Sequence, residues 1–101
     1  MIRHIVMFKL KAFDDPSEKQ ARIAAIKTAL ESLPSHINTI RSIRVDANIN
    51  PTEDWDLILT SEFDTIADVQ AYSVHPAHIA VGRELIAPFR QARACVDYEI
   101  N

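Results

Sequence analysis

The first stretch of the chain, Ile2–Leu10, carries bulky apolar side chains on both faces of a predicted strand. Side chains alternate along a strand, so Val6 and Phe8 lie on one face while Ile5 and Met7 lie on the other. A strand that is apolar on both faces is normally covered on both sides. The sequence therefore predicts a central strand, and the fold must supply a covering for each of its faces.

The rest of the chain alternates between helical and strand periodicity. Asp15 and Pro16 are typical of a helix start, as a capping residue and a first-turn residue, and Pro34 marks the end of that helix. A second helical region, 64–89, is expected to divide into two short helices at Pro76, because the residue before a proline is biased away from helical angles. Further strands are predicted at 40–49, 55–63 and 92–100.

This order of elements, strand–helix–strand–strand–helix–strand, is typical of an α+β ferredoxin-like sandwich, with one antiparallel sheet and helices on one face. Ile5, Met7 and Ile58 would then lie on the uncovered face of the sheet. An exposed apolar patch of this kind indicates an interface. We therefore expect a homodimer that packs sheet against sheet through the open face.

Length and composition set further limits. The chain has 101 residues, which suits a single domain over residues 1–101, and its net charge of -3 includes no basic stripe. A nucleic-acid surface or an anionic membrane is therefore not an expected partner. The single cysteine, Cys95, allows no internal disulfide and suits a reducing compartment. The first residues lack the pattern of a signal peptide and no apolar run is long enough for a bilayer, so we expect a cytoplasmic protein.

The stretch YSVHPAHIAVG, Tyr72–Gly82, concentrates the residues that could carry chemistry. On a helix that starts at Pro76, His78 shares an apolar face with Leu85 and Phe89, so its ring is expected to point inward. Two roles stay open for it. His78 is either a general base, since an imidazole titrates near neutral pH, or a packed histidine bonded to a tyrosine or a backbone carbonyl.

The residues around His78 each leave two interpretations open. His75 is expected to fix the junction between the two short helices, with ligand contact as the alternative. Tyr72 is expected in the core, with a pocket role second. His4 lies on the buried face of the first strand and needs a polar partner, which His78 or Tyr72 could supply. Gly82 either permits close packing of helix on sheet or leaves room for a ligand.

No metal or cofactor is expected. Three imidazoles from His4, His75 and His78 could ligate zinc, but Pro76 leaves the directions of the last two unrelated, and no acidic residue stands within the motif. Serine and cysteine nucleophiles lack a supporting pattern, and a single glycine cannot make a phosphate-binding loop.

Three motifs carry a resemblance to a known family: RHIVMFKLK at the start, HPAH followed by VG, and CVDYEI at the end. In these the chain resembles the stress-responsive A/B barrel (Dabb) domain family over nearly its whole length. The resemblance implies a dimeric α/β barrel, made of two ferredoxin-like units whose sheets face each other.

One member of this family is a plant polyketide cyclase, and the resemblance to it implies roles for particular residues. By that resemblance His78 is the general base, Tyr72 an oxyanion or orientation partner, and His4 part of the pocket wall. His75 belongs to the same HPAH motif and is implied to be a pocket residue as well. This chain departs from the cyclase at Leu57, where the cyclase has a further histidine, and in the first helix, where the cyclase has a tyrosine.

Three functional hypotheses follow from the residues and the resemblance. The first is a pocket between helices and sheet that binds a small, mostly apolar molecule, a carbonyl or phenolic compound, with His4, Tyr72, His75, His78 and Gly82 as ligand-binding residues. The second is a cyclase- or isomerase-like enzyme that uses the same pocket, with His78 and Tyr72 as catalytic residues. The third is a stress-related dimer module whose histidines are structural. An empty space beside His78 would favour the first two.

Overall fold

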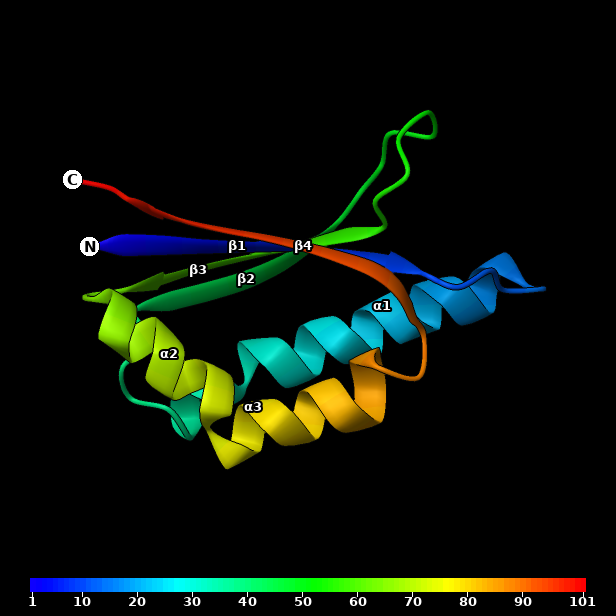
Figure 1. The fold of residues 1–101 in the computed structure, drawn as a ribbon. Helices are drawn as coiled ribbons and strands as arrows, with labels where there is room; N and C mark the ends of the chain where they lie inside the picture. The colour runs from blue at the N-terminus through cyan, green and yellow to red at the C-terminus, as the bar shows by residue number, and fades with distance from the viewer.

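A computed structural model describes all residues, 1–101. One antiparallel sheet has the strand order β2-β3-β1-β4, and the helices cover one of its faces (Figure 1). The elements, in chain order, are β1 (Ile2–Leu10), α1 (Pro16–Glu31), a 3₁₀ turn (Leu33–Ser35), β2 (Ser42–Ala47), β3 (Leu57–Phe63), α2 (Ile66–Val74), α3 (Pro76–Val81), a π-helical turn (Gly82–Ile86) and β4 (Arg90–Glu99). This is the predicted α+β ferredoxin-like fold, with β1 in a central position as its two apolar faces require.

Helix α1 begins as the sequence predicts. The side chain of Asp15 accepts a hydrogen bond from the backbone N–H of Ser17, and Pro16 occupies the first turn. The helix buries Ile26 and Leu30 against the sheet. Fully burying one such side chain contributes about 1.5–3 kcal/mol, so this stripe rather than intrinsic propensity holds α1 in place.

A single core lies between the helices and the covered face of the sheet. The alternate residues of β1 and β3 that face the helices are buried, while their neighbours are only partly buried. Two polar residues, His4 and Ser61, are among the buried ones. The buried hydrophobic residues are Val6, Phe8, Leu10, Ile26, Leu30, Leu33, Ile37, Ile40, Val45, Leu57, Leu59, Phe63, Val69, Tyr72 and Ile86.

The opposite face of the sheet carries no helix (Figure 1). Met7 pairs with Ile58 across β1 and β3, and Ile5 pairs with Val96 across β1 and β4, so these apolar side chains share the open face. Val96 is 54% exposed in the single chain. The loop 48–56 rises from the sheet on this open side (Figure 1), and its Ile49 is 94% exposed. The apolar patch predicted on the open face is therefore present.

The second helical region divides at Pro76, as predicted. His75 has extended backbone angles, so α2 ends before it and α3 starts after it. The structure adds a π-helical turn that the sequence did not predict, in which the N–H of Ala87 donates to the carbonyl of Gly82 at 2.7 Å.

The strand boundaries differ modestly from the predicted ones. Strand β2 is shorter than the predicted 40–49, and β4 begins at Arg90 rather than at residue 92. No helix has both the length and the apolar character needed to cross a membrane.

Candidate functional site

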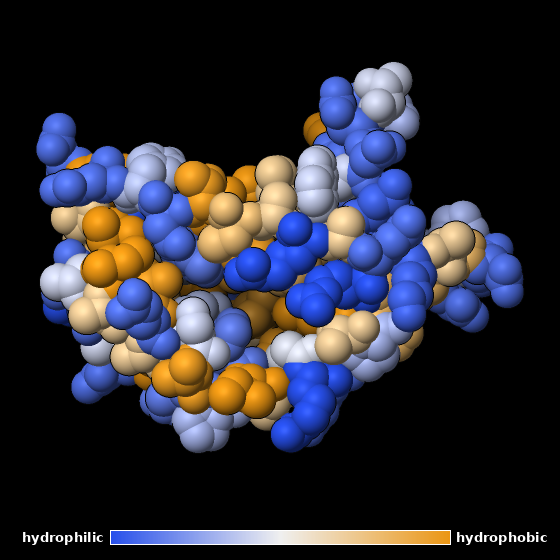
Figure 2. All heavy atoms as spheres, in the orientation of Figure 1, coloured by the Kyte–Doolittle hydropathy of each residue, from blue (hydrophilic) through white to orange (hydrophobic).

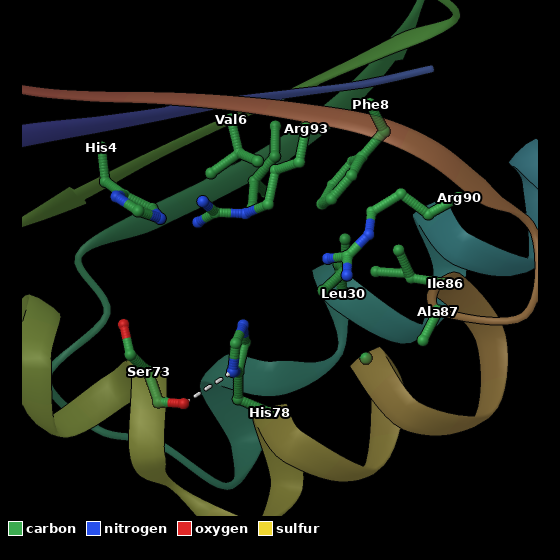
Figure 3. A pocket seen from close by; sticks show the side chains of 12 residues that line it. His4, Val6, Phe8, Leu30, Ser73, His78, Ile86, Ala87, Arg90 and Arg93 are labelled. Carbon is green, nitrogen blue, oxygen red and sulfur yellow. Dashed lines mark hydrogen bonds between the residues drawn. The ribbon is translucent and has the colours of Figure 1, made fainter. Parts of the chain in front are cut away.

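A cavity of about 160 Å³ lies between the sheet and the helices, beside His78. Figure 2 shows it as a hollow with hydrophobic atoms on its floor and hydrophilic atoms along part of its rim. Strands β1, β3 and β4 form one side of it and helices α1–α3 with the π-helical turn form the other (Figure 3). Its lining residues are His4, Val6, Phe8, Leu30, Leu59, Ser73, His78, Gly82, Ile86, Ala87, Arg90 and Arg93.

His78 points from α3 into this cavity (Figure 3). Its Nδ1 lies 3.1 Å from the carbonyl oxygen of Ser73, an acceptor, so Nδ1 carries the proton and donates it to that bond. The remaining ring nitrogen, Nε2, is then an unprotonated acceptor facing the cavity. Burial lowers the pKa of His78, and this effect exceeds the opposing influence of the Ser73 hydrogen bond. The ring is therefore neutral near pH 7, the form that accepts a proton or a hydrogen bond.

His4 has a different polar partner from the two predicted. Its Nδ1 lies 2.6 Å from an Oδ atom of Asp97, which stands directly opposite in the pairing of β1 with β4. The prediction that His78 or Tyr72 supplies this hydrogen bond is wrong, because the carboxylate on the neighbouring strand is already within bonding distance. Tyr72 instead meets the His4 ring edge-on, with ring centroids 6.0 Å apart.

Tyr72 lies behind the histidines and does not border the cavity. It is fully buried, and its ring packs against His78 with centroids 4.4 Å apart and against Phe63 at 5.1 Å. Its hydroxyl has no hydrogen-bond partner, and burial raises the pKa of this phenol well above its ordinary range. Tyr72 is therefore a neutral core residue that supports the His78 ring.

His75 also lies outside the cavity lining. Its Nδ1 accepts a hydrogen bond from the backbone N–H of Ala77 at 3.0 Å, which caps the start of α3. The ring thus fixes the junction between the two helices, which is the role that the sequence favoured. Of the five residues predicted to bind a ligand, the structure brings His4, His78 and Gly82 to the cavity.

Gly82 has open space beside it. A Cβ atom added at this position would meet no other atom within 4 Å. Close packing of helix on sheet is therefore not the reason for a glycine here. The missing side chain enlarges the cavity instead, which is the other of the two alternatives.

Arg90 and Arg93 are cavity residues that sequence reasoning missed. The face of β4 that shares the side of His4 carries Arg93, Cys95 and Asp97 at alternate positions. This alternation could have predicted from the sequence that Arg93 lies on the covered face of the sheet. Arg90 gave no such signal, because an irregularity in the strand pairing brings it to the same face.

One group of side chains has the composition of a metal site. The ligand atoms of His4, Cys95 and Asp97 lie within 4.8 Å of one another, whereas His4, His75 and His78 form no such group. Nδ1 of His4 is already bonded to Asp97, and burial together with the nearby Asp97 raises the pKa of the Cys95 thiol.

Comparison with known families identifies the chain. The stress responsive A/B barrel (Dabb) domain matches residues 2–100. The chain belongs to the Dabb family. A dimeric protein of unknown function with a ferredoxin-like fold, from Bacteroides fragilis, is 44% identical to this Dabb chain, covers 98% of it over 95% of its own length, and superposes with a TM-score of 0.91.

Two other solved structures extend the comparison of this Dabb chain. A Dabb family protein with a ferredoxin-like fold from Mesorhizobium loti is 27% identical, with 99% of this chain and 96% of that chain covered and a TM-score of 0.76. The hydroxynitrile lyase of Passiflora edulis is 19% identical, with 99% and 93% covered and a TM-score of 0.80, which is a likeness of fold alone. Curated proteins give no match.

Proposed function

We propose that this Dabb protein binds a small, mostly apolar molecule in the cavity between its helices and its sheet. The cavity itself carries the proposal, because a hollow that reaches buried apolar side chains and holds a few polar groups is the usual form of a small-molecule site. Its apolar side chains provide van der Waals contact, while Nε2 of His78 offers a hydrogen-bond acceptor to a phenolic or enolic hydroxyl. The open space beside Gly82 supports the same proposal.

The size of the cavity limits the ligand. Its volume of about 160 Å³ is close to that of an engineered protein cavity of about 150 Å³ that takes up benzene. Sites for drug-sized molecules run from about 300 Å³ upward. The enclosed part of the ligand is therefore about one six-membered ring, and any longer substituent would extend out through the mouth.

A fluorinated phenol tests this proposal. We expect 4-fluorophenol to bind wild-type protein, observed as a shift or broadening of its ¹⁹F NMR signal. Gly82→Leu, which places a side chain in the open space, should remove the binding while the protein stays folded. Ala71→Leu adds the same side chain at an exposed position of α2 and serves as the control. Equal binding by both variants would place the ligand elsewhere and overturn the proposal.

A second candidate is an enzyme of the cyclase or isomerase type with His78 as general base. What favours it is the state of that ring: neutral, held by the Ser73 carbonyl, and with a free Nε2 facing the cavity. In this candidate Tyr72 acts by supporting the His78 ring, since its own hydroxyl does not border the cavity. The test is a substrate whose turnover disappears in His78→Ala while its binding and the fold persist. If His78→Ala loses stability but keeps turnover, the role of His78 is structural and this second candidate is wrong.

We also infer that the protein is a homodimer through the open face of its sheet. The apolar side chains of Ile5, Met7 and Ile58 on that face support this, as does the 44% identical relative that is described as dimeric. Sedimentation should show a dimer at micromolar concentration. Ile5→Asp should shift the protein toward monomer, whereas Ile66→Asp, an exposed position of α2, should leave it dimeric. A compact wild-type monomer would refute the inference.

We further propose that the protein is cytoplasmic and takes part in a stress response. The lone free thiol of Cys95 suits a reducing compartment, and the family's name suggests the stress. Fractionation of the source cells, with the protein's abundance followed before and after heat or oxidative stress, tests both points. A membrane-associated or constant pool would contradict them.

A further inference from the structure

Two arginines at the cavity lack the partners that every other arginine in the chain has. Arg3, Arg41, Arg44 and Arg83 each pair with a carboxylate, and Arg22 lies over the ring of Phe89 at 3.8 Å. Arg90 and Arg93 form no ion pair and stack on no ring. Figure 3 shows both side chains extending from β4 into the cavity, with the guanidinium of Arg93 on the side of His4.

The strand is built in a way that brings both arginines to one face. Residues three apart in a regular strand point to opposite faces, so Arg90 and Arg93 would normally diverge. In the pairing of β4 with β1, however, Lys9 stands opposite Ala92 while Leu10 stands opposite Arg90. Gln91 is thus an extra residue, a β-bulge, and it returns Arg90 to the cavity face. Bulges often re-aim a side chain beside a functional site.

No carboxylate in the cavity balances these charges. The nearest acidic group on the same face of β4 is Asp97, which is bonded to His4 at 2.6 Å. The positive charge of Arg93 also contributes to the lowered pKa of His78, after the larger effect of burial. The cavity therefore combines an apolar wall with an excess of positive charge at its sheet side.

We propose that the cavity selects a compact organic carboxylate, whose anionic group is bound by Arg90 and Arg93 and whose hydrocarbon part contacts the apolar wall. The inference rests on the proposed ligand-binding function and names the class of ligand. Guanidinium groups match the two oxygens of a carboxylate. Inorganic phosphate fits less well, because Val6, Phe8 and Leu30 offer its remaining oxygens no hydrogen bonds. Both arginines are exposed to solvent, so they stand at the mouth of the cavity.

Two aromatic ligands of similar size test the proposal. Benzoate and benzyl alcohol share a phenyl ring, and the group attached to the ring is charged in the first and neutral in the second. By isothermal titration calorimetry in low salt, we expect benzoate to bind wild-type protein about tenfold more tightly than benzyl alcohol. Hydrogen bonds to charged groups are stronger than neutral ones, and the exposure of the two arginines to solvent limits the gain. The double variant Arg90→Gln/Arg93→Gln should lose this preference and still bind benzyl alcohol, which shows that its cavity is intact. Arg44→Gln/Arg83→Gln removes two charges elsewhere and should keep the preference.

The possible failures are distinct. Equal binding of benzoate and benzyl alcohol by wild-type protein, or a preference that survives the double substitution at the cavity, overturns the assignment of a carboxylate and leaves ligand binding in the cavity standing. If neither compound binds at millimolar concentration, the proposed ligand-binding function fails, and the carboxylate assignment fails with it.

Discussion

Replacing Gly82 with alanine should make the protein more stable. The residue has helical angles, φ -59° and ψ -47°, and an added Cβ meets nothing within 4 Å, so alanine fits without strain. Alanine is favoured over glycine inside a helix by about 0.8–1 kcal/mol. Burying the new methyl group in part adds up to about 0.8 kcal/mol. The expected gain in the free energy of unfolding is therefore about 1–1.5 kcal/mol.

Urea denaturation at one fixed protein concentration measures this gain, because the stability of a dimer depends on concentration. The midpoint should rise with an unchanged slope, and the melting temperature should rise by about 4–8 °C for each kcal/mol. Ala80→Gly, the reverse change within α3, is the matched control and should lower stability by about 1 kcal/mol.

Gly82→Ala should also weaken binding of 4-fluorophenol, since the added methyl group takes part of the space that the ligand uses. Greater stability with weaker binding is the pattern expected where a glycine is kept for function. A loss of stability on Gly82→Ala would refute the reasoning, because it would mean that Gly82 is closely packed after all.

Three further predictions concern the buried polar groups. Burial lowers the pKa of His78, so the unfolded chain takes up a proton on this ring at a higher pH than the folded chain. The free energy of unfolding should therefore fall as the pH drops from about 6.5 through the lower folded-state pKa. Urea denaturation across this pH range should show a smaller fall in His78→Gln than in the wild-type protein. Tyr72→Phe should leave stability unchanged or slightly increased in thermal melts, because the hydroxyl is buried without a partner. A large loss of stability would reveal a hidden partner. Asp97→Ala should cost about 1–3 kcal/mol in urea denaturation, because Nδ1 of the buried His4 keeps only a weak contact to Sγ of Cys95 at 3.7 Å. A negligible loss would mean that water or this sulfur takes the place of the carboxylate.

The fold could be predicted from the sequence because its signals are local. The two apolar faces of Ile2–Leu10 required a central strand, Asp15 and Pro16 fixed the start of α1, and Pro76 divided the second helical region. Each signal depends on side-chain alternation or on backbone geometry within a few residues. The inward direction of His78 followed in the same way from its place on α3.

The candidate site depended on contacts that local patterns do not contain. His4 and Asp97 are 93 residues apart and meet because β1 and β4 pair in one register, which the sequence leaves open. The bulge at Gln91 reverses the direction of Arg90, and no turn residue announces it. Sequence alone determined that the chain folds as a helix-covered sheet with a histidine aimed inward. The tertiary structure decided what surrounds that histidine, because strand register and the space left between packed side chains are properties of the assembled fold.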